Sequence, residues 1–182
     1  MKFAVVGSGG VGAYFGGRLA EAGHEVTFVA RGAHLEALRS RGLRVASTEG
    51  DFEVAPVRVV ARAAELPAVD FVLLGVKTWQ VREAVSDLGA ALSGGGAVLT
   101  LQNGVEAPDE VASLWGEAAV LPGLCRLMSY VEAPGVIRHA GVRPRIEVGE
   151  TSGAKSPRVA AVLEGFSTCR GGVALSAPDI QA

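Results

Sequence analysis

The stretch that decides the fold reads Phe3-Ala4-Val5-Val6-Gly7-Ser8-Gly9-Gly10-Val11-Gly12. Its first four residues are apolar and typical of a buried strand, and the recurrence of Val11, Phe15 and Leu19 every four residues predicts a helix directly afterwards. Glycines spaced G-x-G-x-x-G at such a turn let the backbone approach a pyrophosphate, which then lies at the helix N-terminus. The sequence therefore predicts a dinucleotide-binding turn formed by Gly7, Ser8, Gly9, Gly10, Val11 and Gly12, with Ser8 contributing its backbone more than its hydroxyl.

The composition is that of a globular protein with room for one good-sized domain, or one and the beginning of a second, in 182 residues. The net charge of −2 comes without a basic run, which argues against nucleic acid as a partner. We find no signal-peptide pattern and no apolar run of membrane-spanning length, and we therefore expect a cytoplasmic protein with no membrane partner. The two cysteines, Cys125 and Cys169, are expected to be core thiols, and no disulfide or metal site is predicted.

Strand-like and helix-like segments alternate as far as about residue 125. Strands are expected at residues 2–6, 25–30, 43–46, 52–60, 69–76, 97–101 and 118–121, and helices at 34–40, 79–92 and 106–115. Later strand candidates at 136–139 and 145–148 have no helix between them, and Ser156-Pro157 opens another helix. This pattern predicts an α/β fold: a Rossmann-like, doubly wound sheet, mainly parallel, with an antiparallel extension.

Ligands of open parallel sheets lie at the carboxyl ends of the strands, and Arg31 falls at the end of the strand predicted at 25–30. An NAD-binding protein normally has an Asp or Glu here for the ribose hydroxyls. A guanidinium pairs bidentately with phosphate and cannot accept hydrogen bonds from those hydroxyls, so Arg31 favours NADP. The alternative is an ordinary solvated arginine before a helix.

Lys77 and Asn103 follow two further predicted strands, and each has a functional and a structural interpretation. Lys77 is either a counter-charge to a cofactor phosphate or bound carboxylate, or a surface lysine. Asn103 precedes a glycine and is typical of a turn, although its amide could also donate to a ribose or carbonyl oxygen. Structural roles are expected for the three histidines, which have no partner at catalytic or metal-ligand spacing: His24, His34 and His139.

Five segments together resemble the ketopantoate reductase (2-dehydropantoate 2-reductase) family. They are Lys-Phe-Ala-Val-Val-Gly-Ser-Gly-Gly-Val-Gly at 2–12, Val-Ala-Arg-Gly at 29–32, Val-Lys-Thr-Trp-Gln at 76–80, Leu-Gln-Asn-Gly-Val-Glu at 101–106 and Pro-Gly-Val-Ile-Arg-His at 134–139. The resemblance implies NADPH-dependent reduction of the 2-keto acid 2-dehydropantoate to pantoate, an oxidoreductase step in pantothenate and coenzyme A biosynthesis. It also implies that Arg31, Lys77 and Asn103 contact the cofactor or lie beside the nicotinamide, and it aligns Ser129 with a further cofactor-contacting position.

The family's general acid has no counterpart in this sequence. The resemblance places it on a lysine in a Trp-x-Lys pattern shortly after Asp-Ile, on the first long helix of a C-terminal helical domain, whereas the present sequence stops at Asp179-Ile180-Gln181-Ala182. Lys2 and Lys155, the lysines other than Lys77, are not natural replacements. We therefore expect a dinucleotide-binding domain at 1–175, the start of a truncated helical domain at 176–182 with a helix from near Asp179, and no activity of this chain alone.

Two other functions remain open at this level. A different NADP-linked reductase of branched 2-keto acids would share the same cofactor half, and the turnover of different keto acids would separate the two. A non-catalytic NADP-binding module would have the same glycine turn. The sequence also leaves the oligomeric state open, a homodimer included.

Overall fold

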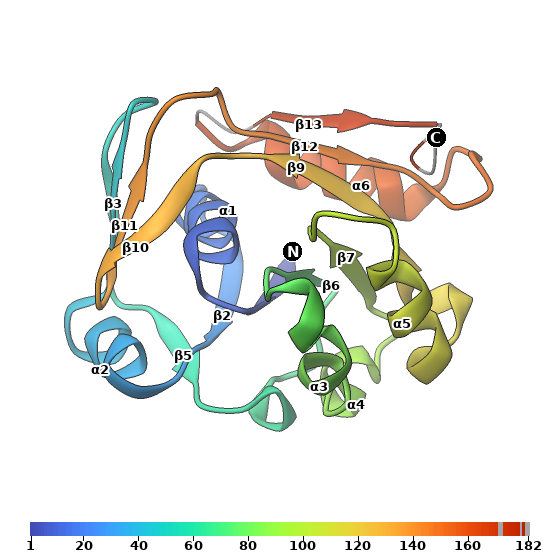
Figure 1. Cartoon of the computed structure of the whole chain (residues 1–182), viewed down its shortest axis with the longest axis horizontal. Helices are drawn as coiled ribbons and strands as arrows, with labels where there is room; N and C mark the ends of the chain where they lie inside the picture. Colours follow the sequence, from blue (N-terminus) through green and yellow to red (C-terminus); the bar gives the residue numbers. More distant parts are fainter. Residues whose placement is uncertain (171–172, 179, 181–182) are drawn as a thin grey trace.

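A six-stranded parallel sheet forms the centre of the molecule (Figure 1). The computed structural model describes residues 1–170, 173–178 and 180. In the order in which they pair, the strands of the sheet are β5 (Arg58–Val60), β2 (Glu25–Val29), β1 (Lys2–Val6), β6 (Phe71–Leu74), β7 (Ala97–Thr100) and β8 (Val120–Leu121). The strand order reverses between β1 and β6, as in a doubly wound Rossmann sheet, so the predicted fold class is confirmed.

Helices cover both faces of this sheet. Side chains of β1 alternate between two apolar clusters, with Phe3 and Val5 in one and Ala4 and Val6 in the other. The first cluster includes α1 (Gly10–Glu21), α2 (Gly32–Arg41) and α6 (Pro157–Ser167); the second includes α3 (Val81–Val85), α4 (Gly89–Leu92) and α5 (Ala107–Trp115). The described part of the chain also contains the 3-10 turns η1 (Ala63–Glu65), η2 (Thr78–Gln80) and η3 (Glu117–Ala119).

Two small sheets lie outside the central one. The first has the order β10 (Ser129–Ala133), β11 (Val136–His139), β3 (Leu43–Ser47) and β4 (Phe52–Val54), and the second has the order β13 (Val173–Ser176), β12 (Arg145–Val148) and β9 (Gly123–Arg126). The predicted antiparallel pairing is present, but it builds separate sheets instead of extending an edge of the central sheet. The reason lies in α1, whose residues 12–19 are all buried. The central sheet covers one side of this helix, and burying the other side requires a second layer of structure.

Two predicted elements are broken in the structure. The strand expected at 52–60 is two strands in different sheets, with Pro56, which has no N–H for a ladder, between them. The helix expected at 79–92 is divided into η2, α3 and α4, and the Ser86 hydroxyl bonds the Glu83 carbonyl where α3 ends. Its predicted apolar face is nevertheless real, since Val81, Val85 and Leu88 are buried together. The sequence did not predict β9, β10 or β13, and the helix expected from near Asp179 falls outside the described residues.

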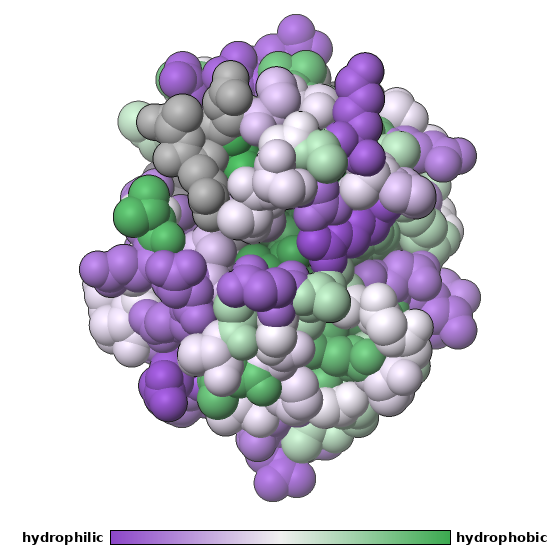
Figure 2. Space-filling model, turned by 90° about the vertical axis from the view of Figure 1, so that its right-hand side faces the viewer, coloured by the Kyte–Doolittle hydropathy of each residue, from purple (hydrophilic) through white to green (hydrophobic). Residues whose placement is uncertain are grey.

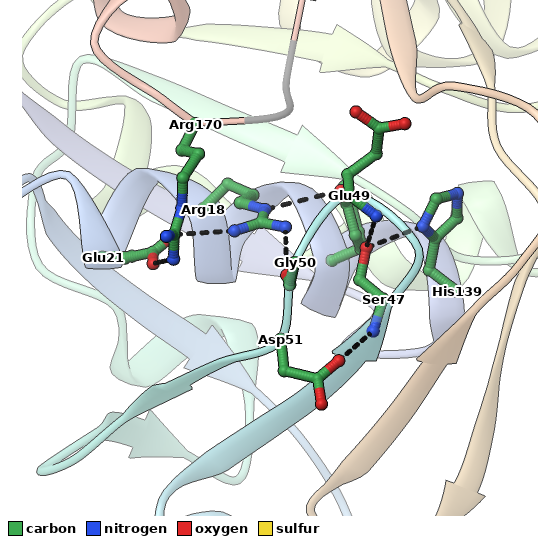
Figure 3. A network of polar contacts seen from close by, with 9 residues as sticks. Arg18, Glu21, Ser47, Glu49, Gly50, Asp51, His139 and Arg170 are labelled. Carbon is green, nitrogen blue, oxygen red and sulfur yellow. Dashed lines mark hydrogen bonds and ion pairs between the residues drawn. The ribbon is translucent and has the colours of Figure 1, made fainter.

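A buried arginine, Arg18, ties the C-terminal end of α1 to the turn between β3 and β4 (Figure 3). Its guanidinium donates to Glu21 Oε2 at 2.9 Å and to the Gly50 carbonyl at 2.8 Å, and it lies 4.0 Å from the centroid of the Phe52 ring. Arg170 also pairs with Glu21, at 2.7 Å. The buried charge is thus paired and hydrogen-bonded, which is the condition under which a core tolerates it.

The face of the molecule on the side of α5 shows hydrophobic residues in several small groups among hydrophilic ones (Figure 2). Among the helices of the described residues, none combines the length and the apolar character needed to cross a bilayer.

Candidate functional site

Three glycines of the turn between β1 and α1 are closely packed by neighbouring residues. Side chains at Gly7, Gly10 and Gly12 would overlap with Val76, with Ser129 and with the Gly7 carbonyl, respectively, and Gly7 has a φ of 96°. Gly9 differs, because a Cβ built there meets nothing within 4 Å. The open side of the turn is therefore at Gly9, where the backbone can face a ligand.

The N-terminus of α1 carries no protein anion of its own. Gly9 is its N-cap and has no side chain to accept hydrogen bonds from the first N–H groups, and the first turn, which begins with Gly10, Val11 and Gly12, contains no acidic residue. The free N–H groups and the helix dipole are available to an anion there. The Ser8 hydroxyl donates to the Val29 carbonyl at 2.8 Å, so the protein itself satisfies this donor.

A cavity of about 360 Å³ adjoins the turn. The residues that follow β1, β2, β5 and β6 line it on one side, and α3 lines it on the other. Arg31 lies in its wall, as the N-cap of α2, with its Nη2 3.6 Å from Glu83 Oε1. Both side chains are largely exposed, at 78% and 74%, so this ion pair is weak and can be exchanged for a ligand.

Lys77 and Asn103 lie outside the cavity wall, on the loops after β6 and β7. Both are exposed, and the Thr78 hydroxyl joins the two loops by donating to the Asn103 carbonyl at 3.3 Å. The buried Gln102 fixes the loops more firmly, since its amide nitrogen donates to the carbonyls of Leu74 and Val76, at 2.7 and 3.1 Å. The structure thus brings Lys77 and Asn103 to neighbouring positions along the same edge of the sheet.

Ser129 lies at the other side of the glycine turn, at the start of β10. Its backbone is packed on Gly10, and its Oγ is buried without a hydrogen-bond partner among the described residues. All the site residues predicted from the sequence are therefore grouped along the carboxyl edge of the central sheet.

Sequence reasoning missed Arg62, Gln102 and the position of His34. His34 lines the cavity, and its Nδ1 accepts a hydrogen bond from the Gly135 backbone at 3.1 Å. Burial lowers the pKa of His34. The imidazole therefore connects the cavity wall to the turn between β10 and β11. No local pattern could have revealed this, because the contact joins residues 101 positions apart.

The other two histidines have structural contacts far from the cavity. The His139 ring bonds the Ser47 hydroxyl at 2.8 Å and the Val142 carbonyl at 3.0 Å. His24 bonds the Gly165 carbonyl at 3.2 Å. Burial raises the thiol pKa of both cysteines to about 11, which suits core thiols.

Several known proteins that resemble this chain in sequence and fold are named 2-dehydropantoate 2-reductase. A family model described as ketopantoate reductase PanE/ApbA matches residues 3–153. The 2-dehydropantoate 2-reductase of Mesorhizobium japonicum is 35% identical over 185 residues, covering 90% of this chain and 56% of that protein. The uncharacterized oxidoreductase YkpB of Bacillus subtilis is 32% identical over 176 residues, covering 97% of this chain and 57% of that protein.

The structural match is equally broad. The crystal structure of 2-dehydropantoate 2-reductase from Geobacter metallireducens has a TM-score of 0.91 at 30% identity, covering 100% of this chain and 59% of that one. The match thus spans a little over half the length of each of these three relatives. The resemblance inferred from the motifs is confirmed: the chain belongs to the ketopantoate reductase family.

Proposed function

We propose that this chain is the NADP-binding half of a 2-dehydropantoate 2-reductase, which reduces the ketone of 2-dehydropantoate in pantothenate and coenzyme A biosynthesis. The observation that carries the proposal is the cavity that runs from the glycine turn to Arg31. Family membership supports the reaction and its substrate, because relatives of this chain are named for them. An arginine where NAD-binding proteins have an acid supports NADP.

The residues around the turn fit a dinucleotide. Open space lies beside Gly9, where a pyrophosphate would approach the backbone, and the uncapped N-terminus of α1 offers N–H donors. Arg31 offers a guanidinium to a 2′-phosphate at the end of β2. When bound, the nicotinamide dinucleotide supplies the hydride that reaches the ketone carbon. In this proposal the turn and Arg31 bind it, and Lys77, Asn103 and Ser129 orient its reacting end.

The reaction also requires a proton donor for the developing alkoxide. Lys2 begins β1 at the edge of the sheet opposite the glycine turn, and Lys155 precedes α6, so neither lies along the crevice. We therefore place the general acid outside these 182 residues, which agrees with relatives that are almost twice as long. In this proposal residues 1–175 form the dinucleotide-binding domain and 176–182 belong to the start of a second domain.

Steady-state oxidation of NADPH, with and without ketopantoate, tests the proposal on this chain. We expect NADPH to bind, which the fluorescence of the exposed Trp79 can follow, without substrate-dependent oxidation at the ~1–10³ s⁻¹ of ordinary enzymes. The reason is that this proposal places the general acid and the enclosing wall of the substrate site outside these residues. Turnover in that range would show that the acid lies within this chain. A chain that binds no nicotinamide cofactor would contradict the proposal altogether.

A further inference from the structure

Arg62, which follows β5, lies beside Arg31 in the register of the central sheet. Val29 of β2 pairs with Val60 of β5, and each arginine comes two residues after its member of the pair. Both arginines have extended backbones, with φ and ψ of −132° and 157° at Arg31 and of −135° and 149° at Arg62. Because neighbouring strands are about 4.8 Å apart, the two side chains start from adjacent positions.

The two arginines also point to the same side of the sheet. Val29 and Val60 both pack in the apolar cluster on the α3 side, and residues two apart in a strand share a face. Arg31 and Arg62 accordingly line the same 360 Å³ cavity, opposite Glu83.

Two guanidiniums side by side repel each other unless an anion lies between them. In the structure each has its own carboxylate: Arg31 is 3.6 Å from Glu83, and Arg62 is 3.1 Å from Glu65. These side chains are exposed, at 78% for Arg31 and 74% for Arg62, so the ion pairs contribute little and are easily exchanged. Neither arginine side chain is buried in the core, so core packing does not explain why the two lie side by side.

We propose that Arg62 and Arg31 together form a two-arginine clamp for the phosphate on the 2′ position of the cofactor's adenosine. The proposal rests on the proposed NADP-binding function and adds Arg62 as a specificity-determining residue. A phosphate monoester carries close to two negative charges at neutral pH, and guanidinium forks match its oxygens. A nucleotide without the 2′-phosphate leaves both positive charges uncompensated by the ligand.

Calorimetric titration with 2′,5′-ADP, and with 5′-AMP as the matched ligand that lacks the 2′-phosphate, tests the clamp without any turnover. We expect Arg62→Gln to weaken 2′,5′-ADP binding about tenfold or more, as loss of a charged hydrogen bond implies, and to leave 5′-AMP within about twofold. Arg58→Gln is the control, because it makes the same change four residues earlier, on β5 itself, outside the cavity and at a residue paired with Glu25. It should leave both affinities unchanged, and circular dichroism verifies that both variants fold.

Two results would overturn the clamp. If Arg62→Gln leaves 2′,5′-ADP binding unchanged while Arg31→Gln weakens it, Arg62 takes no part and the proposed function still stands. If the unmodified chain binds 2′,5′-ADP no more tightly than 5′-AMP, the clamp and the preference for NADP both fail, and titration with NADH then shows whether dinucleotide binding survives.

Discussion

The two ends of α1 differ in how their polar groups are satisfied. At the C-terminal end, the buried Arg18 is paired with Glu21 and bonded to the Gly50 carbonyl (Figure 3). At the N-terminal end, Gly9 provides no side-chain cap and the first turn has no acid. One end is closed by the protein itself, and the other offers donors and open space beside Gly9. The difference teaches that a buried charge can be fully satisfied by the protein, whereas an uncapped helix start at an open turn leaves donors available to a ligand.

The largest effect on stability is expected at the C-terminal end of α1, from Arg18→Met. Removing one partner of a buried ion pair typically costs 3–5 kcal/mol, and we expect about 3 kcal/mol because Arg170 still pairs with Glu21. Urea denaturation measures the loss, and NADPH affinity of the folded variant should be unchanged. Arg170→Met is the matched control, since its side chain is 64% exposed and its loss should cost less than about 1 kcal/mol. Equal losses in the two variants would contradict this assignment.

At the N-terminal end of α1, we expect Gly9→Val to affect NADPH binding and not stability. The backbone of Gly9 is extended, with φ −78° and ψ −162°, and its Cβ position is empty, so stability should change by less than about 1 kcal/mol. NADPH binding should be lost, because the valine occupies the approach to the pyrophosphate. Circular dichroism and calorimetric titration measure the two effects.

Gly94→Val controls for the substitution itself. Gly94 also has open space around its Cβ position, but it precedes β7 at the other edge of the sheet. This variant should bind NADPH normally. A folded Gly9→Val protein that binds NADPH as tightly as Gly94→Val would show that the phosphates lie elsewhere.

A smaller effect is expected on the pH dependence of the free energy of unfolding, to which His34 contributes. Its pKa is below the ordinary 6.5 in the folded chain because of burial, so below pH 6.5 the unfolded chain takes up the proton more readily. The free energy of unfolding should therefore fall as the pH drops from 7 through the folded-state pKa. Protonation also places a hydrogen on Nδ1, which now accepts from Gly135. Urea denaturation at pH 5 to 7 should show a shallower decline for His34→Gln; identical slopes would contradict the account.

Much of the candidate site at the N-terminal end of α1 could be predicted, because the sequence patterns that indicate it are local. The spacing of the glycines and the apolar periodicity of strands and helices depend on neighbouring residues. Parallel strands then bring Arg31, Lys77 and Asn103 to one edge, whatever the details of the loops.

The missed residues depend on contacts between distant segments. Arg62 lies beside Arg31 because β5 leaves the β4 hairpin and pairs with β2, whereas the sequence suggested one strand over 52–60. Gln102 donates hydrogen bonds to carbonyls of β6 and of the loop that follows β6, up to 28 positions earlier in the chain. The small sheets were missed for the same reason, since β11 pairs with β3 across about half the chain.

The most direct test of the central claim, that the open end of α1 is an NADP site, is the affinity of the unmodified chain for NADPH and NADH by calorimetric titration. We predict tighter binding of NADPH, by about tenfold or more, and loss of most of that difference in Arg31→Ala, since one charge-assisted contact is worth roughly 1.5–3 kcal/mol. Equal affinity for the two cofactors in the unmodified chain would contradict the claim.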